Sequence, residues 1–198
     1  MNTVPNSATD ILRSLDSRRS IPARQLDAPG PDAATLARML RAAVRVPDHG
    51  RRVPFRFLRI AGPARACLGE ALTAIARHRD PDASQAVLDK DRERFNHAPL
   101  VIAVIAVLDA SDDKIPAQER LLSAGCVCFA LLQAAQGHGF GAQWLTGWPA
   151  YDRQVHALLG VGEEERVAGF IHIGTPRADA PERERPDPLA LLSDWSPA

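Results

Sequence analysis

The chain has 198 residues, a length that suits one domain with a substantial buried core. Its 24 basic and 24 acidic residues cancel and are interleaved, which argues against a nucleic-acid-binding surface. The two longest apolar runs, residues 100–108 and 121–135, are shorter than the roughly 20 residues that span a bilayer, so we expect no membrane segment.

The first half of the chain is predicted to be mainly helical. Asp32 is placed to cap the second of four helices, and residues 55–60 alternate as in a strand with one exposed face, after a turn-rich connection at 47–54. Apolar spacing and helix-start signals predict the four helices over residues 10–17, 32–45, 63–77 and 84–96.

A buried strand and a long apolar helix are predicted next. Residues 100–108 are rich in β-branched side chains and do not alternate, as expected for a central strand covered on both faces. Residues 116–136 form a helical pattern that is apolar nearly all round between 121 and 135. Such a helix either threads the centre of the domain or is covered by a second copy of the chain, and we favour a homodimer.

The last third is predicted to add two strands and an arm. A strand is expected within residues 139–146 and another over 167–174, with a short helix at 151–159 between them. Residues 177–188 are too polar to form a core, whereas 189–195 regain apolar character. We therefore expect a single α+β domain over residues 1–198, with residues 177–198 as a C-terminal arm whose end docks elsewhere.

The cysteines and the N-terminus indicate a cytoplasmic protein. Cys67, Cys126 and Cys128 are odd in number and lack Cys-x-x-Cys spacing, so we expect reduced thiols in the core. The N-terminus lacks the basic start and apolar stretch of a secretory signal.

Several chemistries are excluded by missing motifs. There is no Gly-x-Ser-x-Gly elbow, and no two of the six histidines stand at metal-ligand spacing, so we expect no metal site. The glycines of residues 137–141 follow a predicted helix and precede a strand, the reverse of a Rossmann turn. They instead suit a turn that ends the helix or a close approach of the backbone to a flat ligand.

Arg18-Arg19-Ser20 is the first candidate binding motif. Arginine forks donate paired, charge-assisted hydrogen bonds to phosphate oxygens, and a neighbouring serine supplies a further donor. The alternative is that basic residues favour the negative end of a helix dipole while Ser20 ends the helix.

Several segments in order and at characteristic spacing resemble the flavin-dependent nitroreductases, especially their small bacterial YdjA type. The likeness covers nearly the whole chain, and no single motif in it is specific. The matching segments are residues 17–20, 40–49, 54–57, 98–102, 123–126, 139–141 and 169–176.

The resemblance implies a central mixed or antiparallel β-sheet surrounded by helices, and FMN held between the subunits of an intertwined homodimer. It places the FMN phosphate and ribityl chain on Arg18, Arg19 and Ser20. It also implies that Arg45 and His49 reach the flavin from the other subunit, and that the strand containing Trp144, Leu145 and Thr146 lies against the isoalloxazine ring. A segment associated with the nicotinamide nucleotide corresponds to Ala134, Ala135, Gln136, Gly137, His138 and Gly139, for which a buried helix end is an equal alternative.

The chemistry implied by the resemblance is carried by the cofactor. NADH or NADPH delivers a hydride to flavin N5, and a quinone, nitroaromatic or similar electron-poor acceptor then takes two electrons in a ping-pong cycle. No catalytic side chain is required.

Departures from the family pattern leave two other functions open. Val53 and Phe55 stand in a segment that is often Gln-Pro-Trp, and Pro22 stands where a further arginine is common. A flavin-binding protein for storage or sensing, without turnover, is one alternative, and a cofactor-free interaction protein on the same fold is the other.

Overall fold

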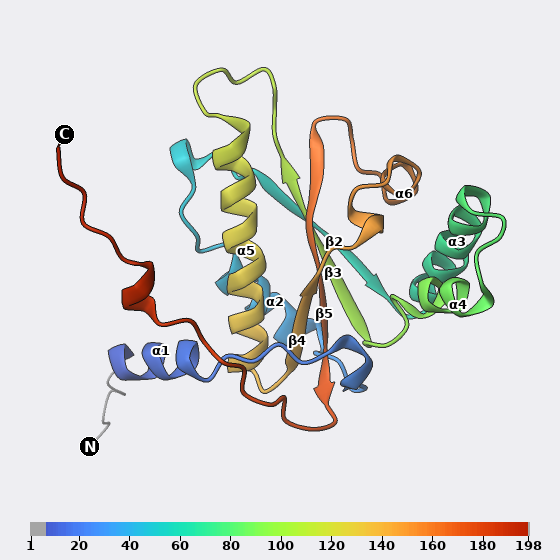
Figure 1. Cartoon of the computed structure of the whole chain (residues 1–198), viewed down its shortest axis with the longest axis horizontal. Coiled ribbons are helices and arrows are strands. Elements are labelled where there is room, and N and C mark those ends of the chain that lie inside the picture. Colours follow the sequence, from blue (N-terminus) through green and yellow to red (C-terminus); the bar gives the residue numbers. More distant parts are fainter. Residues whose placement is uncertain (1–6, 198) are drawn as a thin grey trace.

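An antiparallel sheet forms the centre of the molecule in the computed structural model, which describes residues 7–197 (Figure 1). The strand order is β1-β5-β3-β2, and β4 also pairs with β5. Every strand pair is antiparallel. The strands are β1 (Leu26–Asp27), β2 (Phe55–Ala61), β3 (Leu100–Val107), β4 (Gly141–Leu145) and β5 (Glu165–Pro176).

Six helices surround the sheet, close to the ranges expected from the sequence. Asp32 caps the second helix as predicted, because its Oδ1 accepts a 2.7 Å hydrogen bond from the backbone N–H of Thr35. The helices are α1 (Ser7–Asp16), α2 (Ala33–Ala43), α3 (Pro63–Arg79), α4 (Gln85–Glu93), α5 (Ala117–Gly137) and α6 (Arg153–Leu159).

Two cores lie on the two faces of the sheet. Helices α2 and α5 pack on one face through residues such as Met39 and Leu131. On the other face α3 and α6 contribute Leu72 and Val155 (Figure 1). The prediction of a central strand is confirmed, since β3 pairs on both edges and is buried from Leu100 to Ala106.

Helix α5 buries one face and leaves the other open. Val127, Cys128 and Leu131 are fully buried against the sheet. The opposite face carries apolar side chains that remain exposed, namely Leu121, Leu122 and Phe129 at 43, 61 and 40%. The described chain therefore covers only half of the apolar helix.

The cysteine prediction is wrong for two of the three residues. Cys128 is buried, and burial raises the pKa of its thiol to about 12. Cys67 and Cys126 are exposed, because they lie on the outward faces of α3 and α5. Their position relative to the core depends on helix orientation, which the apolar run around Cys126 does not reveal.

The C-terminal arm leaves the end of β5 and passes α1 (Figure 1). Arg177 anchors its start, donating from Nε to Asp27 Oδ2 at 2.6 Å. Within and after the short 3₁₀ turn Pro188–Leu191, the arm's large apolar side chains remain at least 71% exposed: Leu189, Leu191, Leu192 and Trp195. Within residues 7–197, the end of the arm therefore does not dock against the rest of its own chain, contrary to the expectation from the sequence.

His172 is a buried histidine in β5 opposite Val101. Its ring stacks on Phe95 with centroids 5.7 Å apart, and its Nδ1 has no hydrogen-bond partner in the described chain. Burial, followed by electrostatic repulsion from His97 and Arg94, lowers the pKa of His172 from 6.5 to about 4. The ring is therefore held neutral.

We expect this histidine to make folding stability depend on pH. The unfolded chain takes up a proton near pH 6.5 that the folded chain refuses until about pH 4, so stability is full above pH 6.5 and falls toward pH 4. The expected loss between pH 7 and 5 is about 2 kcal/mol, measurable by urea unfolding. His172→Asn should remove most of this pH-dependent loss. An unchanged loss in the variant would assign it to other groups.

Candidate functional site

A cluster of arginines lies where the N-terminal segment meets the C-terminal arm. Arg18, Arg19 and Ser20 follow α1, and the arm brings Arg183 and Arg185 opposite them. Together with Pro181 they line a small cavity of about 30 Å³. We call Arg18, Arg19, Ser20, Arg183 and Arg185 the arginine cluster.

The cluster carries an excess of positive charge and unused donors. Arg18 Nη1 donates to Ser20 Oγ at 3.2 Å, which holds both side chains of the predicted motif together. Arg19 and Arg185 share one carboxylate, that of Glu182, with 3.1 Å between Arg185 Nη2 and Glu182 Oε1. Four guanidinium groups against one carboxylate form a site whose chemistry fits a phosphate dianion.

Sequence reasoning missed Arg183 and Arg185. Their spacing could have indicated a shared basic face, because residues two apart in an extended chain point to the same side. Arg24, which stands two residues after Pro22, is exposed and does not line this cavity.

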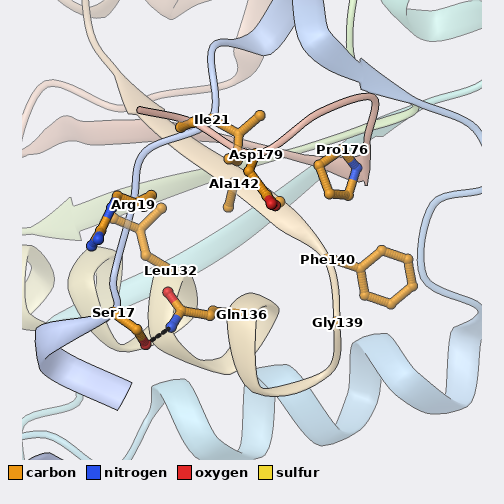
Figure 2. A pocket seen from close by; sticks show the side chains of 12 residues that line it. Ser17, Arg19, Ile21, Leu132, Gln136, Gly139, Phe140, Ala142, Pro176 and Asp179 are labelled. Carbon is orange, nitrogen blue, oxygen red and sulfur yellow. Dashed lines mark hydrogen bonds between the residues drawn. The ribbon is translucent and has the colours of Figure 1, made fainter. Parts of the chain in front are cut away.

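A larger cavity of about 460 Å³ adjoins the cluster through Arg19 (Figure 2). Gln136 of α5 donates from Nε2 to Ser17 Oγ at 2.9 Å across one side of it. Gln136 and Gly139 are the residues of the 134–139 segment that line this cavity. The others do not: Ala135 is buried, Ala134 is half-buried, and Gly137 and His138 are exposed.

Trp144 lies in a mainly apolar groove of about 590 Å³ between α5 and the sheet. Its Nε1 donates to the carbonyl oxygen of Ala168 at 3.1 Å. A Cβ at Gly169 would clash with that nitrogen, so glycine is required beneath the indole. Leu145 and Thr146 follow half-buried at the end of β4. The groove's lining includes Leu108, Leu121, Leu122, Gly125, Trp144, Tyr151, Val167 and Ala168.

His49 lies beside the start of α5. Arg45 is exposed just after α2, and His49 Nδ1 is 2.7 Å from Glu119 Oε2. The loop that carries His49 is held by Asp48, whose carboxylate accepts from the backbone N–H groups of Arg52 and Val53 at 3.0 and 2.8 Å.

The same loop contains Val53, whose backbone is strained and which stands at a position where the sequence departs from the family pattern. Val53 has a φ of 49°, in the left-handed region that β-branched residues rarely adopt. Such strain persists only where surrounding contacts impose it, and here the Asp48 hydrogen bond does so.

Within one chain, the predicted flavin contacts lie at opposite ends of α5. Residues 18–20 are at the end near Gln136, and His49 is at the end near Glu119. Glu119, next to His49, and Gln136, next to Ser17, are 17 residues apart on the helix, which corresponds to about 26 Å at 1.5 Å per residue. Trp144 lies between them, with its ring 3.9 Å from where a Cβ at Gly125 would be.

The described residues contain no group of three or more His, Cys, Asp or Glu side chains arranged to hold a metal ion. None of the helices in residues 7–197 has the length and apolarity needed to cross a membrane.

The family model described as the nitroreductase family matches residues 15–175. This chain belongs to the nitroreductase family. Two curated relatives are named "Putative NAD(P)H nitroreductase". YdjA of Escherichia coli K12 is 36% identical over 187 residues, covering 93% of this chain and 98% of YdjA. The Haemophilus influenzae relative is 35% identical over 175 residues, covering 88% of this chain and 92% of its own length.

Solved structures confirm the nitroreductase fold. A nitroreductase-like protein from Bacillus cereus superposes with a TM-score of 0.80 at 20% identity, covering 98% of each chain. Lactococcus lactis CinD, solved with nicotinic acid, gives 0.73 at 21% identity and covers 94% of this chain and 100% of its own. A Desulfovibrio desulfuricans protein solved with FMN gives 0.72 at 20% identity, covering 94 and 98%.

Proposed function

We propose that this nitroreductase-family protein is an FMN-dependent NAD(P)H oxidoreductase that works as a homodimer. The observation that carries the proposal is the arginine cluster, which offers four cations and a hydroxyl to a phosphate beside a cavity of about 460 Å³. Acceptors in this proposal are nitroaromatics, quinones and similar flat, electron-poor molecules.

The phosphate of FMN is assigned to the arginine cluster. Arg18 and Ser20 are already joined by a hydrogen bond, so their donors are partly preorganised. Arg183 and Arg185 add charge from the arm, which makes the site a junction between the two ends of the described chain. This assignment extends the predicted motif by two residues.

The flavin ring is assigned to the apolar groove that Trp144 lines, with Leu145 and Thr146 following Trp144 at the end of β4. When bound, FMN would supply the two-electron chemistry, because no protein side chain in the groove can accept a hydride. The chain's part is to orient the ring and the nicotinamide, and to keep water away with apolar walls such as Leu121 and Val167. The segment around Gln136 and Gly139 is proposed to contact the nicotinamide nucleotide from the adjoining cavity.

A homodimer reconciles the positions of the two contact groups. His49 lies about 26 Å along α5 from the Ser17 end, a separation that one FMN does not bridge within one chain. In a two-fold dimer that packs α5 against an antiparallel copy, the start of one helix lies beside the end of the other. The exposed apolar face of α5 is the surface that such packing would bury.

A visible spectrum of the purified protein tests this function. We expect a flavin absorption band that bleaches when NADH or NADPH is added without oxygen and returns with a quinone. A yellow protein that neither nucleotide bleaches would indicate a flavin-binding protein without turnover. A colourless protein whose melting temperature does not rise with added FMN would overturn the proposal.

A further inference from the structure

Glu182 is a carboxylate placed inside a site built for an anion. It forms ion pairs with Arg19 and with Arg185, and its Oε1 also accepts from the backbone N–H of Arg183 at 3.0 Å. Within residues 7–197 it is the one carboxylate that pairs with any arginine of the cluster. Its contacts join the arm to the N-terminal segment.

Carboxylate and phosphate compete for the same guanidinium donors. A phosphate at the cluster would meet Arg19 and Arg185 already engaged by Glu182, and two anions held on the same donors repel each other. Both Glu182 and Arg185 are about half exposed and lie on the arm, so the carboxylate can turn into water without disturbing the core. Displacing it therefore costs little beyond two ion pairs near the surface and one backbone hydrogen bond.

We propose that Glu182 is an internal counter-anion that the phosphate of FMN displaces. This inference rests on the proposed function. In the flavin-free protein Glu182 neutralises part of the cluster and holds the arm against residues 18–20. Its carboxylate lowers the affinity for phosphate-bearing flavin, so Glu182 is an affinity-determining residue that opposes binding.

Removing the charge of Glu182 should therefore tighten FMN binding. Glu182→Gln is expected to lower the dissociation constant for FMN about fivefold at low salt, the size of effect that a surface ion pair can have. Riboflavin lacks the phosphate, so its affinity should not change. The gain for FMN should shrink at high salt, where exposed charges are screened.

Glu184→Gln is the matched control. Glu184 lies two residues away on the same exposed arm and makes no hydrogen bond or ion pair within the described residues. The two variants have the same net charge, so a general effect of charge would appear in both.

The experiment is a fluorescence titration of the full-length protein, freed of flavin by dialysis, with FMN and with riboflavin. Tighter FMN binding in Glu182→Gln alone, with riboflavin unaffected, supports displacement. Equal or weaker FMN binding in Glu182→Gln, an equal gain in Glu184→Gln, or an equal gain for riboflavin would overturn it. If the unmodified protein binds neither flavin, the proposed function itself has failed, which is a distinct result.

Discussion

Arg18→Ala is expected to weaken FMN binding about a hundredfold while leaving the helices, the sheet and the oligomer intact. Charge-assisted hydrogen bonds contribute about 1.5 to 3 kcal/mol, and a fork that donates twice lies at the upper end. A loss of this size corresponds to about two orders of magnitude in the dissociation constant. Arg18 is outside the hydrophobic cores, so its removal should not unfold the protein.

Arg24→Ala is the control for this variant. Arg24 belongs to the same N-terminal segment and is exposed, but it lies outside the arginine cluster. Flavin occupancy from the visible spectrum, with circular dichroism to check folding, distinguishes the two variants. Full flavin occupancy in Arg18→Ala would show that the phosphate does not bind at this cluster.

Leu122→Glu is expected to separate the dimer and to release the flavin, because Leu122 lies on the exposed apolar face of α5 and also lines the groove assigned to the flavin ring. Leu122 is 61% exposed on the apolar face of α5, and a carboxylate there would be desolvated in the proposed interface without a partner. Within one chain the same side chain stays in water, so folding should be unaffected. We expect the dimer dissociation constant to rise at least a hundredfold, as measured by analytical ultracentrifugation.

Val87→Glu provides the matching substitution away from that face. Val87 is 50% exposed on α4, which belongs to the opposite side of the sheet. This variant should remain dimeric and retain flavin. A dimeric Leu122→Glu variant that keeps its flavin would place the subunit interface elsewhere.

The predicted roles of the flavin contacts stay predictions, but the structure shows which of them share a location. Arg18, Arg19 and Ser20 lie together, whereas, of Trp144, Leu145 and Thr146, Trp144 alone lines the apolar groove. His49 lies far from the first group along α5. That separation gives a physical reason for the expectation that His49 acts from a second subunit.

Local patterns in the sequence determined most of the secondary structure. The unbroken apolar run of β3 has no polar face to offer water, so it had to lie at the centre of the sheet. The Asp32 carboxylate can satisfy an N–H that the first turn of α2 leaves free, and it therefore marked the start of that helix. The resemblance to nitroreductases, based on the order of several short segments, identified the family.

Contacts between distant segments were decided only by the tertiary structure. Helical periodicity could not say which side of α5 faces the sheet, because apolar residues occur nearly all round it, and so Cys126 was misplaced in the core. Sequence periodicity also could not predict that Arg183 and Arg185 lie close to Arg18, because their proximity depends on the path of the whole chain between them. The periodicity of apolar residues shows which faces of a helix or strand avoid water. The relative positions of charged side chains from distant segments are set by how the intervening sheet and helices pack.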